Sequence, residues 1–160
     1  MLDVPPESFD RLVNINMRGT YFLSQRIARR MLAEPGHSST RPERSMFFLS
    51  SGNAVIATAT QAEYCITKAG IAMMATLYAM RLAEAGIAVH EIRPGMIRTD
   101  MTADVFDKYD SVVQSGRLPI PRWGEPEDIG RTVAALASGA LPYVTGHAFH
   151  VDGGFHIRRS

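Results

Sequence analysis

Two stretches of this 160-residue chain, Met46-Phe-Phe-Leu-Ser-Ser51 and Glu63-Tyr-Cys-Ile-Thr-Lys68, decide its fold. The first is an apolar run that predicts a short buried strand ending at serines. The second opens a long helical pattern in which Tyr64 and Lys68 are four residues apart, so both side chains lie on one face. A phenol beside an ammonium, with a hydroxyl delivered from a strand end, can donate a proton to a carbonyl oxygen.

The Tyr-x-x-x-Lys spacing has a second interpretation. On most helices such a pair lies at the surface, where the lysine stem covers the ring. The strand before Ser51 and the segments after the helix favour a functional site over a surface pair.

Strands and helices alternate along the rest of the chain. We expect helices at 6–33, 61–84 and 126–138, strands at 45–50, 87–92 and 147–151, a surface loop at 34–44 and irregular helices at 96–123. Alternation of this kind predicts a parallel sheet with helical crossovers. The fold class is therefore α/β, a doubly wound parallel sheet, with residues 1–160 forming a single domain.

The first helix carries one polar residue on its apolar face. That face consists of Phe9, Val13, Asn16, Thr20, Leu23, Ile27 and Met31, at spacings of three and four. An amide on an inward face must find hydrogen-bond partners. The pattern leaves two alternatives open for Asn16, a buried structural amide and an active-site group.

Composition excludes several classes of protein. Seventeen basic and sixteen acidic residues give a net charge of +1, which indicates neither a nucleic-acid nor a membrane-binding protein. The single cysteine, Cys65, allows no intrachain disulfide, and the N-terminus does not resemble a signal peptide. We therefore expect a cytoplasmic protein.

The histidines near the C-terminus suggest no metal site. His147 and His150 are three apart in a predicted strand, so they point to opposite faces. No carboxylate or cysteine cluster is evident beside them or beside His156, and no metal is expected.

Several motifs in order resemble the short-chain dehydrogenases/reductases, and among them the 3-oxoacyl-(acyl-carrier-protein) reductase-like members. The motifs that carry the resemblance are Asn14-Ile-Asn-Met-Arg-Gly-Thr-Tyr-Phe22, Leu49-Ser-Ser51, Glu63-Tyr-Cys-Ile-Thr-Lys-Ala-Gly70, Arg93-Pro-Gly-Met-Ile-Arg-Thr-Asp100, Pro121-Arg-Trp-Gly-Glu-Pro-Glu-Asp-Ile129, Tyr143-Val-Thr-Gly146 and Val151-Asp-Gly-Gly154. The resemblance covers nearly the whole chain and implies a Rossmann-like fold.

The resemblance implies a catalytic role for four residues. Tyr64 corresponds to the general acid or base, and Ser51 to the group that orients the substrate oxygen. Lys68 corresponds to the residue that binds the nicotinamide ribose and favours the phenolate of Tyr64, and Asn16 to the asparagine that holds a relay water. The implied activity is hydride transfer between NAD or NADP and a carbonyl or alcohol substrate. A 3-oxoacyl thioester competes with sugars, polyols, steroids and small ketones as that substrate.

The resemblance also implies cofactor contacts and partners. Pro94, Gly95, Ile97 and Thr99 correspond to the segment beside the nicotinamide, together with Tyr64 and Lys68. The stretch from Met96 to Leu118 corresponds to a mobile substrate lid. Helices 6–33 and 61–84 correspond to a homo-oligomer interface, forming a dimer or tetramer.

One part of the family pattern is missing. The chain has no Thr-Gly-x-x-x-Gly-x-Gly turn and no residue that chooses between NAD and NADP, so the N-terminal strands and the Gly-rich loop of the fold are not expected. We expect exposed apolar surface and poor stability of the isolated polypeptide. The alternative to an enzyme is a non-catalytic truncated subunit that acts as a dimerisation or interaction module.

Overall fold

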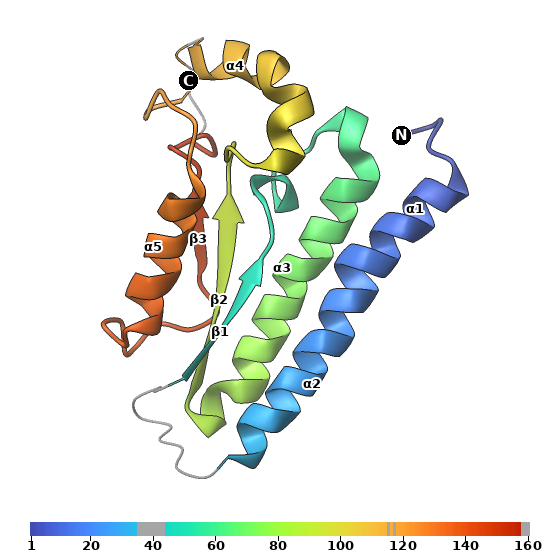
Figure 1. The fold of residues 1–160 in the computed structure, drawn as a ribbon. Helices are drawn as coiled ribbons and strands as arrows, with labels where there is room; N and C mark the ends of the chain where they lie inside the picture. Colours follow the sequence, from blue (N-terminus) through green and yellow to red (C-terminus); the bar gives the residue numbers. More distant parts are fainter. Residues whose placement is uncertain (35–43, 115, 117, 158–160) are drawn as a thin grey trace.

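A three-stranded parallel sheet lies at the centre of the computed structural model, which describes residues 1–34, 44–114, 116 and 118–157. Strands β1 (Arg44–Leu49), β2 (Ile87–Pro94) and β3 (Ala148–Val151) are adjacent in that order. The pairing is parallel throughout, so all carboxyl ends meet at one edge (Figure 1). The predicted parallel sheet is confirmed, while most of the predicted loop at 34–44 lies outside the described residues.

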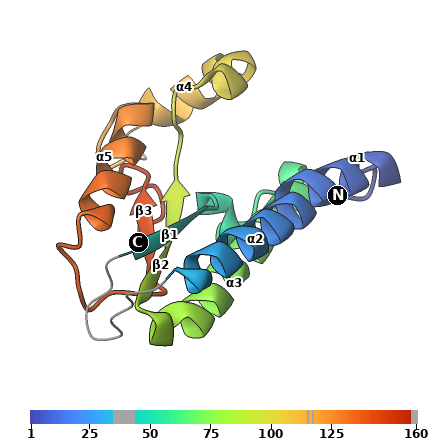
Figure 2. The ribbon, with the colours of Figure 1, turned by 60° about the horizontal axis from the view of Figure 1, so that its bottom comes forward.

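Helices cover both faces of this sheet (Figures 1 and 2). Helix α3 (Ala62–Leu82) packs on one face, and α5 (Pro126–Ala137) lies on the other. Helix α4 (Phe106–Gln114) lies beyond the carboxyl ends of the strands. After α3 a single 3-10 turn leads to Gly86, whose φ of 63° is the left-handed conformation expected of a helix-ending glycine.

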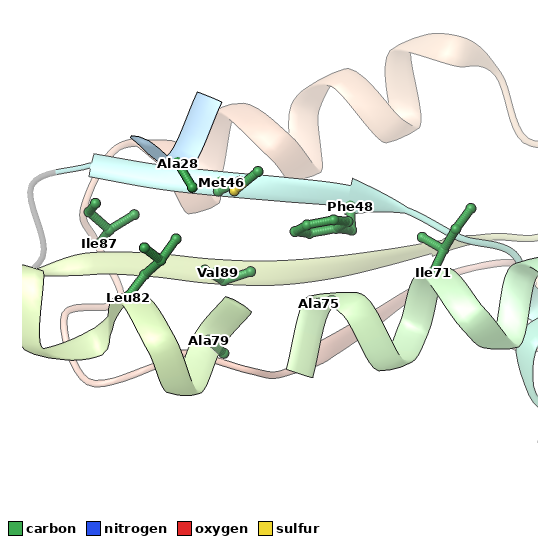
Figure 3. Close-up of a cluster of buried hydrophobic side chains, with 9 residues drawn as sticks. All are labelled: Ala28, Met46, Phe48, Ile71, Ala75, Ala79, Leu82, Ile87 and Val89. Atoms are coloured by element: carbon green, nitrogen blue, oxygen red, sulfur yellow. The ribbon is translucent and has the colours of Figure 1, made fainter. Parts of the chain in front are cut away.

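The main core lies between α3 and strands β1 and β2 (Figure 3). It consists of Ala28, Met46, Phe48, Ile71, Ala75, Ala79, Leu82, Ile87 and Val89. A second, smaller cluster of Val113, Leu118 and Trp123 lies under α4. The first cluster packs the helical layer on one face of the sheet, and the second holds together the region of the predicted lid beyond the carboxyl ends of the strands.

The first helix differs from its prediction. Helix α1 (Pro6–Leu12) continues through a π-helical segment, Val13–Gly19, into α2 (Thr20–Ala33), forming one rod beside α3 (Figure 2). Each π-helical turn takes up an extra residue, which rotates everything that follows. Leu23 and Ile27, predicted to face inward, are therefore 61% and 42% exposed, while Ser24 and Ala28 are buried.

The rod and α3 both leave large apolar side chains in solvent. The exposed apolar residues on this pair of helices are Phe9, Ile15, Tyr21, Phe22, Leu23, Ile27, Ile66, Met73, Leu77 and Met80. This confirms the expected exposed apolar surface. Among the described helices, none has the length and apolar character needed to cross a membrane.

Candidate active site

Ser51 lies two residues beyond the end of β1, at the carboxyl edge of the sheet. Its Oγ accepts a hydrogen bond of 3.1 Å from the N–H of Asn53 and so caps a short 3-10 turn, Gly52–Ala54. The carbonyl of Leu49, two residues earlier, lies 3.4 Å from Nζ of Lys68. The strand end is thus held between its own turn and α3.

Tyr64 and Lys68 lie together on the face of α3 that meets this strand end. Nζ of Lys68 is 5.5 Å from the centre of the Tyr64 ring. The hydroxyl of Ser51 lies near enough to the phenol of Tyr64 to lower its pKa as a hydrogen-bond partner. The structure therefore brings together the three side chains from which the sequence prediction started.

Burial sets the protonation of both groups. It raises the pKa of Tyr64 above 10.0, and the hydrogen bond from Ser51 only partly opposes this. Burial also lowers the pKa of Lys68. The prediction was that the ammonium would favour the phenolate, but the pKa of the phenol is raised because desolvation is the largest effect.

Asn16 lies in the π-helical segment and faces α3. Its Nδ2 donates a 3.0 Å hydrogen bond to Oγ1 of Thr67, which in turn donates a 2.9 Å bond to the carbonyl of Tyr64. Thr67 is fully buried. The amide that the sequence left between two interpretations is thus both hydrogen-bonded and linked to the backbone of Tyr64.

Pro94 and Gly95 stand where β2 ends. The N–H of Gly95 donates a 3.0 Å bond to the carbonyl of Val151 on β3. A Cβ atom at Gly95 would lie 2.6 Å from Cα of Asp152, so a side chain cannot be placed here without movement of the backbone. The absence of a side chain lets the ends of β2 and β3 approach each other closely.

Ile97 and Thr99 continue from this point toward α4. Ile97 forms an isolated parallel bridge with Gly124, which leaves its own N–H directed away from Gly124. Thr99 is exposed and forms a capping box with Thr102 at the start of a 3-10 turn, Asp100–Val105. All the predicted cofactor-binding residues therefore lie at or beyond the carboxyl edge of the sheet.

The predicted lid is fastened to its base by aromatic contacts. The ring of Phe106 stacks on Trp123 at 4.3 Å, and the guanidinium of Arg98 lies 4.7 Å from the centre of the Phe106 ring. Nε1 of Trp123 donates a 3.2 Å bond to Asp110. Tyr109, on the same helix, slightly raises the pKa of Tyr64.

A cluster of titratable groups at the C-terminal end was missed. Asp152 accepts hydrogen bonds from His156, and its Oδ2 is 3.6 Å from Nδ1 of His150, whose ring stacks on that of His156. The expectation that no carboxylate accompanies these histidines is therefore wrong. Gly153 and Gly154 have φ of 62° and 85°, and this turn brings His156 back to Asp152.

The cluster is placed against a fixed positive charge. Nη1 of Arg93 lies 3.4 Å from Nε2 of His150. Burial lowers the pKa of His150, proximity to His156 and Arg93 adds to the effect, and Asp152 opposes it. The guanidinium therefore disfavours any further positive charge on or beside this ring.

Comparison with known proteins gives the family. A family profile described as enoyl-(acyl carrier protein) reductase matches residues 1–156. The 3-oxoacyl-[acyl-carrier-protein] reductase of Rickettsia felis is 33% identical over 149 residues, which are 92% of this chain and 58% of the relative. The L-rhamnose 1-dehydrogenase (NAD(P)(+)) of Azotobacter vinelandii is 35% identical over 157 residues, 98% of this chain and 59% of the relative.

A solved structure agrees with these relatives. The crystal structure of 3-oxoacyl-[acyl-carrier protein] reductase from Brucella melitensis in complex with NAD superposes with a TM-score of 0.94 and 43% identity. It is matched over 100% of this chain and 62% of its own length, so the chain spans less than two thirds of the relatives it matches.

Fold and site together define an α/β protein of the Rossmann-like class, with a serine, a tyrosine and a lysine at the carboxyl edge of its sheet. The chain belongs to the short-chain dehydrogenase/reductase family.

Proposed function

We propose that this chain is the catalytic part of an NAD(P)-dependent oxidoreductase that acts on a carbonyl or alcohol substrate. The observation that carries the proposal is the joining of Ser51, Tyr64 and Lys68 at one strand end. Relatives named as 3-oxoacyl reductases and as an NAD(P)-dependent dehydrogenase support it. When bound, the nicotinamide supplies the hydride.

Tyr64 has the properties required of the proton donor. Burial keeps its phenol protonated at neutral pH, which suits donation to a carbonyl oxygen as that oxygen gains charge. The hydroxyl of Ser51 lies near the same phenol, so a carbonyl oxygen placed near both can accept from the two hydroxyls. In the alcohol-oxidising direction the same phenol must first lose its proton, which burial opposes.

The residues around Lys68 fit the nicotinamide end of the cofactor. One contact of Nζ goes to the carbonyl of Leu49, and an ammonium has two further N–H groups that can bind ribose hydroxyls. The N–H of Ile97 and the exposed hydroxyl of Thr99 lie on the same edge, next to Pro94 and Gly95, where they can bind the carboxamide and a phosphate. These groups lie at the nicotinamide end of the cofactor, whereas NAD and NADP differ at the adenosine ribose. The proposal therefore covers both NAD and NADP.

Asn16 completes the proposed site. Its hydrogen bond to Thr67 fixes the amide beside the backbone of Tyr64, and π-helical segments often occur at functional positions. We assign to Asn16 the holding of a water that passes a proton toward Lys68 and Tyr64.

For the substrate we favour a 3-oxoacyl thioester. The inner side of the lid is apolar, with Met96, Phe106 and Tyr109 packed against Trp123. Such a surface suits an acyl chain better than a sugar. Two named relatives, the Rickettsia and Brucella reductases, act on this substrate class by their names.

The test is nicotinamide oxidation, measured by absorbance, with a 3-oxoacyl thioester and with a sugar lactone as competing substrates. We expect Tyr64→Phe to lower kcat by about 10² to 10⁴, the usual range for loss of a general acid. Tyr143→Phe is the matched control, because Tyr143 is fully exposed, and it should leave kcat unchanged. Equal activity of the two variants would exclude Tyr64 as the acid.

A second candidate function rests on the exposed apolar face of α2 and α3. Met80 is 75% exposed and Leu77 57%. We propose that this face, within the predicted regions 6–33 and 61–84, pairs with a second copy of the chain, whether or not the chain is catalytic. Light scattering after gel filtration tests this: a dimer is expected, and Met80→Lys should yield the monomer. A monomeric wild-type chain at tens of micromolar contradicts the pairing.

Binding of the cofactor separates the two functions. A dissociation constant for NADPH or NADH in the micromolar range, measured by calorimetry, supports the enzyme. Absence of binding at millimolar cofactor, together with a stable dimer, supports the interaction module.

A further inference from the structure

A buried polar network lies directly behind Ser51. The hydroxyl of Ser50 donates a hydrogen bond to Oε1 of Glu91. Arg93 donates to both oxygens of the same carboxylate, from Nε to Oε1 and from Nη2 to Oε2, each at 2.8 Å. Ser50 and Glu91 are each only 4% exposed, so this is a core interaction and not a surface ion pair.

The strand register brings these three residues together. Phe48 of β1 is opposite Glu91 of β2, and side chains alternate along a strand, so Ser50, Glu91 and Arg93 reach the same side of the sheet. At the other end of the network the guanidinium approaches His150 of β3, its partner in register. The network therefore spans the carboxyl ends of all three strands.

The network restrains the residue before Ser51 at two points. The N–H of Ser50 donates a 3.0 Å bond to the carbonyl of Ile92, and its hydroxyl is held by Glu91. A buried carboxylate is costly unless its oxygens are paired, and here Arg93 and Ser50 pair both of them. The side chain and the N–H of Ser50 are both held, so the backbone directly before Ser51 is restrained.

We propose that Glu91 is a positioning residue, which acts through Ser50 to direct the hydroxyl of Ser51 toward Tyr64, with Arg93 holding the carboxylate in place. The inference rests on the proposed function, since Ser51 is a catalytic residue only there. Nothing in the apolar character of the predicted strand 87–92 indicated this role, although Glu91 and Arg93 are two apart and of opposite charge.

The kinetic test uses Ser50→Ala, which removes one hydroxyl and leaves the ion pair intact. A displacement of a reacting group by about 1 Å can cost about a hundredfold in rate, so we expect kcat to fall by about ten- to a hundredfold while KM changes little. Glu91→Gln should have a similar effect. The double variant should be no slower than the slower single one, because both changes act on the same contact between Ser50 and Glu91.

A second readout does not depend on turnover. The hydrogen bond from Ser51 lowers the pKa of Tyr64, so misplacement of Ser51 should raise the pH at which Tyr64 loses its proton. We would follow the tyrosine Cζ signals by NMR across pH in the wild-type chain, assigning Tyr64 by its loss in Tyr64→Phe. The Tyr143 signal serves as the internal control, and Ser138→Ala, the same change at the exposed end of α5, as the control variant.

The outcomes separate the two claims. A higher Tyr64 midpoint in Ser50→Ala, with Tyr143 unmoved and Ser138→Ala unchanged, supports the positioning role. An unchanged Tyr64 midpoint overturns it, as do additive kinetic losses in the double variant. A wild-type chain without turnover contradicts the proposed function alone, and the titration still decides the inference.

Discussion

Gly95 provides a sharp test of how closely the ends of β2 and β3 must approach. In Gly95→Ala the new methyl carbon would lie 2.6 Å from both Cα and Cβ of Asp152, whereas ordinary contacts are 3.4–4 Å. The strand ends must therefore separate by about 1 Å, and forced overpacking costs about 1–3 kcal/mol. For a domain of this size each kcal/mol lowers Tm by about 2–4 °C, which gives a loss of about 2–12 °C.

The matched control is Gly130→Ala in helix α5. Gly130 is exposed, and a Cβ atom there meets nothing within 4 Å, so alanine should stabilise the helix by about 0.5–1 kcal/mol. The midpoint of thermal unfolding, followed by circular dichroism, should therefore fall in Gly95→Ala and rise in Gly130→Ala, although the chemical change is the same. A Gly95→Ala chain as stable as wild type would refute the close approach of β2 to Asp152.

Three further predictions concern the core and the titratable groups. Leu82→Ala, at a fully buried position, should lower the free energy of unfolding in urea by about 2–5 kcal/mol. Leu77→Ala, at a largely exposed position, should lower it by less than about 1 kcal/mol, and equal losses in the two variants would contradict the assigned core. The side-chain hydrogen bond from Arg122 and the backbone hydrogen bond from Glu125 lower the pKa of Asp128 from 3.8 to about 2. The stability that charged Asp128 contributes is therefore present above pH 4 and lost as pH falls toward 2. In Asp128→Asn, the free energy of unfolding in urea should lack the decline that this loss causes between pH 4 and 2. Tyr64 should lose its proton above the ordinary pKa of 10.0, because burial raises its pKa; an alkaline absorbance titration of the wild-type chain against Tyr64→Phe checks this, and a midpoint below 10 would contradict its burial.

Local spacing explains why part of the site was predictable. Tyr64 and Lys68 are one helical turn apart, and Ser51 follows an apolar strand, so each placement depends on a single element and its end. The alternation of strands and helices likewise predicted the parallel sheet. The helix-ending role of Gly86 followed from its place after the periodic residues.

Features that depend on pairing or on unusual backbone were missed. The π-helical segment around Asn16 takes up an extra residue, which the spacing of the apolar residues does not predict. The inward face of the helix after it therefore lies one position from the predicted face. The contact of Ser50 with Glu91 needs the register of β1 on β2, and the contact of His156 with Asp152 needs two glycines at positive φ. Neither distance along the sequence nor residue type alone carries that information.

Trp123 gives the molecule an optical property that follows from its position. It is the one tryptophan in the chain and is 5% exposed. It stacks on Phe106 and donates a hydrogen bond to Asp110, both in α4. Movement of α4 away from the sheet would bring water to this indole and shift its emission to longer wavelength. The position of α4, the helix of the predicted lid, can therefore be followed by intrinsic fluorescence, without any attached dye.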